Sequence, residues 1–463
     1  MGSLFGLLGT MGSALQAQQA AMDVTGNNVS NANTPGYVRQ TAVLQAVPAT
    51  ADSDGGVTVS SIQRAFNSFT YGQVLVQTGL QGSADARNSA LTEAQATIAP
   101  TGGGAVGDSI NSFFSAVQTL SASPSDPSAR SAVLQQATQV AQAFSTTASG
   151  LQQQQSGILT QAQGLATTLN TTLSQIASLN GQIAQANAAG QSPADLEDQR
   201  DQLVTTVAQG MGASVVTDST GAVTLFSGNT VLVSGSNAST VSVGIDANNA
   251  MQVNVQRPGG STIDITQNVT DGTLGGLRES RDTDIAQSLQ SLDQLAYSFS
   301  NAVNAVQSSG YGLDGQTGRN LFTAPTQVQG AAASMAVDPS VAGQPNNIAT
   351  ASDPNDLPGG NDTAVALAQV ANQSLGSMGT ATSAFAAITA QIGNAAAAAS
   401  TDSATRAETV TQAQNLNSSA SGVSLEEESV NLTKFQQAFE AASRVLQAAD
   451  SLLSDFMTTM STN

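Results

Sequence analysis

The 463-residue sequence contains no cysteine, no histidine and no tryptophan. The lack of cysteine excludes disulfides, thiolate nucleophiles and most zinc sites. The lack of histidine excludes the usual general base at neutral pH and the Ser-His-Asp triad. Lys434 is the only lysine, which leaves little room for Schiff-base chemistry. We therefore expect no enzyme, no cofactor and no metal site, with hydrolysis by two carboxylates as the one formal exception.

Positive charge is also scarce, because 12 Lys and Arg face 32 Asp and Glu for a net charge of −20. Nucleic acid is an unlikely partner, since binding phosphates requires a basic surface, and anionic membranes are disfavoured for the same reason. No segment approaches the ~18 consecutive apolar residues of a membrane span. The apolar N-terminal stretch lacks the basic flank of a cleaved secretion signal, as the first basic residue is Arg39. The sequence predicts a soluble protein, or one that leaves the cell without a cleaved signal.

What the sequence does have is a heptad pattern at each end. The N-terminal pattern follows alternating spacings of four and three, with Gln18 and Thr25 at two of its positions and apolar residues at the others: Leu4, Leu8, Met11, Leu15, Met22 and Val29. The C-terminal pattern is stronger and is broken only by Glu428: Leu425, Leu432, Phe435, Phe439, Ala442, Leu446, Ala449, Leu453, Phe456 and Met460. Core packing would explain either pattern alone. If the two helices pair, they form an antiparallel coiled-coil stalk with both termini at one tip.

The string SNANTPGYVRQ at 30–40 should end the first helix. Asn31 and Asn33 favour caps and turns, Pro35 pushes Thr34 out of the helical region, and Gly36 can adopt a positive φ. The two segments that follow, YVRQTAVLQAVP and GGVTVSSIQRAF, have the composition of strands around a glycine-rich bend. They predict a β-hairpin.

The interior predicts further helices around one β insertion. A proline-free apolar stripe indicates a helix over about 129–189, roughly 90 Å long. Between about 212 and 272 the apolar period changes from helical to two, which predicts a small antiparallel β unit. The other expected helices cover 66–98, 106–122, 193–210 with a start signal at Ser192, the region after 273, 362–377 and 380–417.

The acidic cluster around Arg200 is the only grouping that suggests metal or acid/base chemistry, and its members are Asp195, Glu197, Asp198 and Asp201. Three of these carboxylates lie in the first turns of a predicted helix, where the helix dipole favours them. Glu197 could also pair with Arg200 three residues later. A solvated helix face or a packing motif is the better interpretation.

The predicted fold is mainly α, a long-helix bundle rod with a coiled-coil stalk formed by both termini and a small inserted antiparallel β domain farthest out. The predicted divisions are the N-terminal stalk helix, the long-helix domain with its hairpin, the β insertion, the second part of the long-helix domain, and the C-terminal stalk helix: 1–34, 35–211, 212–272, 273–423 and 424–463.

Four stretches carry a family resemblance. The string SNANTPGY, which includes Asn31, Asn33, Thr34, Pro35, Gly36 and Tyr37, resembles the N-terminal signature of the axial proteins of the bacterial flagellum, namely rod, hook and hook-associated proteins. The stretch SGVSLEEESVNLTKFQQAFEAASRVLQAADSLL resembles their closing motif. LEDQRDQLV at 196–204 and DGTLGGLRESRD at 271–282 resemble the interior of the hook-associated members.

This resemblance implies a structural protein of the junction between hook and filament, which self-assembles into a tubular lattice. The implied partners are hook protein, a second junction protein, further copies of the chain, and an export chaperone on the C-terminal helix around Leu446, Leu453 and Phe456. It also implies flagellar type III export and an extracellular location. Two alternatives are a hook or distal rod protein, which LEDQRDQLV and the length disfavour, and a secreted carboxylate-dependent cell-wall hydrolase.

Overall fold

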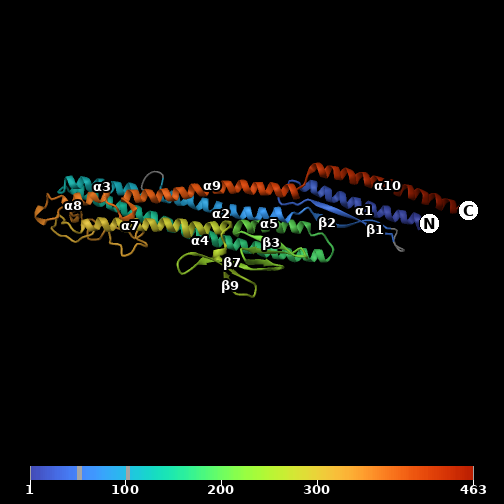
Figure 1. Ribbon diagram of the computed structural model, residues 1–463, viewed down its shortest axis with the longest axis horizontal. Coiled ribbons are helices and arrows are strands. Elements are labelled where there is room, and N and C mark those ends of the chain that lie inside the picture. The colour runs from blue at the N-terminus through green and yellow to red at the C-terminus, as the bar shows by residue number, and fades with distance from the viewer. Residues whose placement is uncertain (1, 50–54, 101–104, 462–463) are drawn as a thin grey trace.

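The computed structural model describes residues 2–49, 55–100 and 105–461. The molecule is a long rod whose main helices run along its length, with both termini at the same end (Figure 1). The helices are α1 (Gly2–Asn31), α2 (Ser68–Ile98), α3 (Val106–Ala122), α4 (Pro127–Ala188), α5 (Ala194–Met211), α6 (Gly272–Glu279), α7 (Ala286–Gln307), α8 (Asp362–Gln369), α9 (Ala381–Ser421) and α10 (Leu425–Ser461).

The mainly helical prediction with an inserted antiparallel β region is confirmed, and α4 is a single helix of 62 residues. Its start is specified by Asp126, whose side chain accepts a hydrogen bond from the Ser128 amide, and by a proline in the first turn. Two details differ. Ser192 does not cap α5, because Pro193 is the cap residue and the Ser192 hydroxyl donates to the Ile62 carbonyl on the hairpin. The helix expected over 362–377 ends at Gln369 and continues as short 3₁₀ turns.

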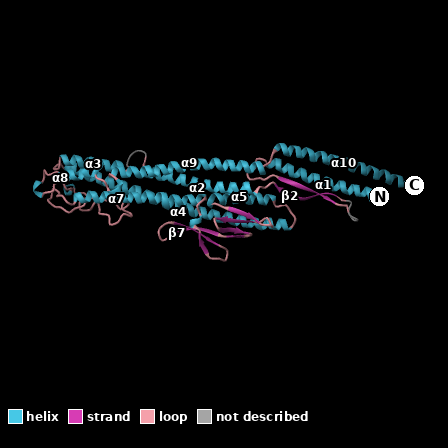
Figure 2. Ribbon diagram, in the orientation of Figure 1, coloured by secondary structure: helices cyan, strands magenta, loops and turns pink. Residues whose placement is uncertain are grey.

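The strands form a hairpin and two small sheets (Figure 2). In the hairpin, β1 (Gln40–Val47) pairs antiparallel with β2 (Gly56–Arg64), and part of the predicted bend, 50–54, lies outside the described residues. The first sheet contains β3 (Ser214–Thr217), β4 (Val223–Ser227), β5 (Thr230–Ser234) and β6 (Asn237–Ala238). The second contains β7 (Thr240–Ile245), β8 (Met251–Gln256) and β9 (Thr262–Asp264).

The β region lies on the flank of α4 and not at the outer end of the rod, so its predicted outermost position is wrong (Figure 1). Two asparagines of α4 hold it there. Asn170 exchanges hydrogen bonds of 2.8 and 2.7 Å with the carbonyl and amide of Val241, and Asn180 makes the same pair with Val223 at 2.8 and 3.0 Å. The outer end is instead formed by α3, α8 and the loops around them.

The core of the outer end combines aromatic packing with one buried cation. Phe113 and Phe299 have ring centroids 6.1 Å apart in an edge-on arrangement, which is a favourable aromatic geometry. Arg130 is fully buried, and its guanidinium donates to the Pro124 and Ile348 carbonyls and to the Thr350 hydroxyl. Burial lowers the pKa of Arg130 to about 10. These bonds tie the start of α4 to the long loop that precedes α8.

Candidate functional site

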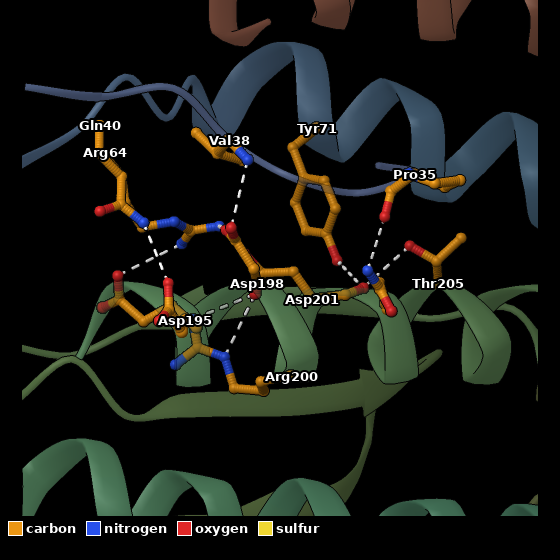
Figure 3. Close-up of polar contacts among 12 residues, drawn as sticks. Pro35, Val38, Gln40, Arg64, Tyr71, Asp195, Asp198, Arg200, Asp201 and Thr205 are labelled. Carbon is orange, nitrogen blue, oxygen red and sulfur yellow. Dashed lines mark hydrogen bonds and ion pairs between the residues drawn. The ribbon is translucent and has the colours of Figure 1, made fainter. Parts of the chain in front are cut away.

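The candidate site is the joint where the terminal stalk meets the rod. The stalk consists of α1 and α10, which pack against each other, and the hairpin lies along α1. At the joint the segment that leaves α1, the hairpin and the start of α5 come together, with Tyr71 of α2 beside them (Figure 3). The start of α10 lies there too, so segments up to 400 residues apart in sequence meet at one place.

The predicted motif forms the turn that leaves α1. The Thr34 amide donates to the Asn31 carbonyl at 2.9 Å, and the Thr34 hydroxyl reaches the Asn31 side chain at 3.2 Å, which closes the turn at the helix end. Asn33 is exposed. Pro35 accepts a 2.8 Å hydrogen bond from the Gln202 side chain of α5. Gly36 has φ +80°, and a Cβ there would lie 2.6 Å from the Gln202 Nε2 atom, so both the turn and the close approach require glycine.

Asn28, near the end of α1, links three elements. Its Nδ2 donates to the Gln40 carbonyl at 2.7 Å and to Glu428 Oε2 of α10 at 3.1 Å. Its Oδ1 accepts from the Gln40 amide and from the Tyr37 hydroxyl, both at 2.9 Å. The exposed fraction is 1% for Asn28 and 3% for Glu428. The side-chain amide therefore uses all of its hydrogen-bonding capacity inside the joint.

Arg64, at the end of β2, neutralises the acidic face of α5. Its guanidinium lies 3.3 Å from Glu197, 2.9 Å from Asp201 and also in contact with Asp198. Arg200 turns the other way, toward Asp201 at 3.1 Å and the Gly221 carbonyl at 2.6 Å. Most of the cluster is thus a buried packing motif, as one of the two interpretations predicted, whereas Asp195 is exposed and accepts a 3.1 Å hydrogen bond from the Gln40 side chain. The solvated face and the Glu197–Arg200 pair were wrong, because the hairpin folds over this face of α5.

Burial governs the ionisation of this cluster. It raises the pKa of Asp198 to about 6, even though Arg64 and the Val38 amide favour the charged carboxylate. Burial also raises the pKa of Tyr37 to about 12, helped by the nearby carboxylates of Asp198, Asp195 and Glu428. The pKa of Tyr71 is raised by its burial as well, and its hydroxyl donates to the Asp201 carbonyl at 2.7 Å. Both phenols therefore remain neutral hydrogen-bonding groups at physiological pH.

The N-terminal heptad residues lie on the stalk at intermediate burial. Five of them are partly covered in the single chain: Leu4, Leu8, Met11, Leu15 and Met22. Val29 is 41% exposed. The fully buried line of α1 is offset from this stripe and passes through Ala17, Ala21, Val24 and Asn28. The offset arises because α1 is covered from two directions, by α10 and by the hairpin.

The larger C-terminal heptad residues divide into two groups. Five are partly covered: Leu432, Phe435, Phe439, Leu446 and Leu453. Three are exposed in the single chain: Leu425, Phe456 and Met460. Ser424 caps the start of α10, as the Glu427 amide donates to the Ser424 hydroxyl at 3.4 Å. No described helix of the chain is both long and apolar enough to cross a membrane.

Sequence patterns missed the residues that hold the joint together. Asn28 and Gln40 flank the motif without any signal of their own, and Arg64 is one charge at the end of a strand. Glu428 did carry a signal, because it interrupts an otherwise apolar heptad stripe. An acidic residue on a buried stripe indicates a polar partner, although the stripe does not say which residue provides it.

Comparison with known families matches both ends of this architecture. Residues 8–37 match the model of the flagella basal body rod protein, and residues 414–460 match that of the flagellar basal body rod FlgEFG protein C-terminal region. A stalk built from both chain ends and joined to a helical rod is thus the architecture of a flagellar axial protein. Residues 91–322, about half of the chain, match the model of the flagellar hook-associated protein FlgK helical domain. The chain belongs to the flagellar hook-associated protein 1 family.

Individual relatives agree with this assignment. The flagellar hook-associated protein 1 of Salmonella typhimurium is 33% identical over 67% of this chain, and the match spans 58% of the length of that relative. The Bacillus subtilis protein of the same name is 30% identical, with 98% of each chain covered. The fold is similar to that of the flagellar hook junction protein FlgK from Burkholderia pseudomallei, with a TM-score of 0.66, 18% identity, and coverage of 74% of this chain and 99% of that one.

Proposed function

We propose that the chain is a structural junction protein of the bacterial flagellum that connects hook to filament by self-assembly into a tubular helical lattice. The observation that carries this proposal is the apolar surface that the stalk leaves uncovered in a single chain. On α10, Val445, Leu452 and Phe456 follow one another at spacings of seven and four, and are 41%, 59% and 43% exposed. Such residues lie on one face of a helix, so they form a continuous apolar strip.

Burial of this strip by a neighbouring copy would stabilise the lattice. Covering the exposed half of a large apolar side chain contributes about 1 kcal/mol, so the strip contributes a few kcal/mol at each contact. Because every copy presents the same strip, the small contribution is repeated around the tube. When the strip of one copy packs against a different surface of the next copy, the contact is heterologous and generates a ring or a helical assembly.

The charge of α1 also supports packing between copies. Asp23 is its one charged residue in a chain of net charge −20, and Phe5 is 57% exposed on the same helix. Copies of such an acidic chain repel one another along most of their surface. An almost uncharged helix lets them approach without opposing like charges. We propose that both heptad stripes, on α1 and α10, are assembly interfaces.

The proposed partners follow from the family. They are hook protein on one side, the second junction protein on the other, and further copies of this chain within the tube. A flagellar export chaperone would cover α10 around Leu446, Leu453 and Phe456 before type III export. The proposed location is outside the cell, at the hook–filament junction, and the proposed division of the assembled chain remains 1–34, 35–211, 212–272, 273–423 and 424–463.

The match of residues 91–322 to a hook-associated helical domain supports this role over that of a hook or rod protein. A cell-wall hydrolase is disfavoured because three carboxylates of the acidic cluster on α5, those of Glu197, Asp198 and Asp201, are taken up in ion pairs with Arg64 and Arg200.

The test is the double variant Val445→Asp/Leu452→Asp. Both residues are exposed in the single chain, so the purified monomer should keep its circular dichroism spectrum and melting temperature. In a strain that carries only this variant, we expect hooks without filaments, flagellin in the medium and loss of swimming. The matched control, Gln436→Asp/Gln447→Asp, adds the same charge at exposed polar positions of α10 and should swim normally. Normal filaments in the apolar-to-Asp variant would refute the proposed interface.

A further inference from the structure

The interface between α1 and α10 contains a buried polar contact, between Asn28 and Glu428. Helical asparagines that pair with both the amide and the carbonyl of one extended residue recur in this fold, at Asn28, Asn170, Asn180 and Asn304. Of these four, Asn28 is the one whose amide also bonds a carboxylate, that of Glu428 on the partner helix. One side chain thus attaches α1 to the hairpin and to α10 at the same time.

The apolar part of the stalk specifies its register only weakly. The fully buried apolar residues of α1 are small, namely Ala17, Ala21 and Val24, and α10 contributes Ala449. Small side chains make shallow knobs, and the larger heptad residues of both helices are at most partly covered, so neighbouring registers of the two helices differ little in packing. A buried polar residue on a helix seam is a recognised means of selecting one register, because the other registers leave it without a partner.

A shift of one helical turn shows what the polar pair excludes. The chain runs out along α10 in the direction opposite to α1, so the helices are antiparallel. A slip of four residues one way brings Glu428 opposite Val24, and a slip the other way brings Asn28 opposite Leu432. In both cases a buried polar group loses its hydrogen-bond partner and faces an apolar side chain, which is strongly unfavourable.

We propose that the Asn28–Glu428 pair determines the register of the stalk and selects pairing of α10 with the α1 of the same chain. The hairpin holds Asn28 in place. Asn28 is also bonded to Gln40 and Tyr37, so its position is set relative to the joint. The hydrogen bond to Glu428 then aligns α10 with that position. The further consequence, that a slipped stalk would present misaligned strips to neighbours in the tube, rests on the proposed function.

The test is a distance measurement between spin labels on the purified chain. The native sequence has no cysteine, so each spin label can be attached to an introduced cysteine and no native cysteine has to be replaced first. Labels at Gln19 of α1 and Gln436 of α10, both exposed, report the register. A second pair at Thr92 and Thr401, exposed on α2 and α9, reports the fold of the rod.

The unmodified chain should give one narrow stalk distance. The variant Asn28→Leu/Glu428→Leu keeps the seam buried but removes the polar pair, so it should add a second population displaced by about one turn, ~5 Å. The matched control, Asn27→Leu/Glu426→Leu, makes the same exchanges at the exposed neighbouring positions and should keep the single distance. A single unchanged distance in the first variant, or a broad distribution in the unmodified chain, would overturn the proposal.

A third variant decides the case if the leucine exchanges disturb the rod distance. Asn28→Asp has nearly the same shape but places two carboxylates together, so the unmodified stalk distance should be lost. Its retention would overturn the register role. These measurements use the isolated chain and need no hook or filament. Failure of the junction function in cells would therefore leave them unaffected, and their failure would leave the junction function unaffected.

Discussion

Replacing Arg64 by methionine is the most direct test of how the hairpin is anchored to the rod. The Arg64 side chain is 7% exposed, and its carboxylate partners Glu197, Asp198 and Asp201 are 21%, 9% and 10% exposed. Methionine fills much of the same volume but leaves these acidic groups without their cation. The hairpin and α5 would then be held by the remaining bonds of the joint.

The expected size of the effect follows from burial. Removing one partner from a buried ion pair costs about 3–5 kcal/mol, because the other charge remains in a poorly solvated place. We expect a loss of this size in the free energy of unfolding at pH 7.5. Arg64 also lowers the pKa of Asp198, so its removal should move that pKa further above its present value of about 6.

The sign of the pH dependence follows from this shift. A carboxyl whose pKa in the folded chain exceeds its unfolded value, about 3.9, is stabilising when protonated, and this stability is lost as pH rises through the folded pKa. Acidification from pH 7.5 to pH 5 should therefore reduce the cost of Arg64→Met by about 1 kcal/mol or more.

Urea unfolding followed by circular dichroism at pH 7.5 and pH 5 measures both quantities. The control is Arg406→Met, which removes an exposed i, i+4 pair with Asp402 and should cost less than about 0.5 kcal/mol at either pH. A cost of Arg64→Met below about 1 kcal/mol at pH 7.5, or an equal cost at both pH values, would contradict the role of Arg64 as the buried anchor of the hairpin.

Two further predictions concern the same joint. In the unmodified chain, protonation of Asp198, with its pKa of about 6, should add about 1 kcal/mol to the free energy of unfolding between pH 7.5 and pH 5. Asp198→Asn should remove this increment, and an identical pH profile in urea titrations would contradict the assignment. Gly36→Ala should lower stability by about 1–2 kcal/mol, because alanine is strained at φ +80° and displaces Gln202. Gly9 lies within α1, and a Cβ added there would meet no atom outside the neighbouring helix backbone within 4 Å, so Gly9→Ala should raise stability by up to about 1 kcal/mol. The melting temperatures of the two variants should therefore shift in opposite directions.

Several elements of the fold are specified by residues that lie within a few turns of one another. The long helix α4 could be predicted because its apolar stripe and the absence of proline act over successive turns of one segment. The end of α1 could be predicted because Asn31, Pro35 and Gly36 restrict their own backbone or that of a neighbour. The change of period near 212 likewise predicted strands, although not that they form two sheets.

The contacts that form the joint could not be predicted from the sequence. The acidic residues of α5 were compatible with a solvated helix face or with a packing motif, since nothing nearby in sequence neutralises them except Arg200. Arg64 does so from a distance of 137 residues along the chain in its bond to Asp201. The β region was expected at the outer end, but Asn170 and Asn180 attach it to the flank of α4, and neither residue is distinguished in the sequence.

The sequence alone therefore determined the helices, the hairpin, the β insertion and the amphipathic character of both chain ends, because each depends on residue types and spacings within a few turns. Tertiary structure decided which face of α1 is buried, which residue satisfies Glu428, and how Asp198 ionises. These depend on pairs of groups up to 400 residues apart, as between Asn28 and Glu428. The energy of a buried polar group is set by what the folded chain brings against it, and spacing along the sequence does not contain that information.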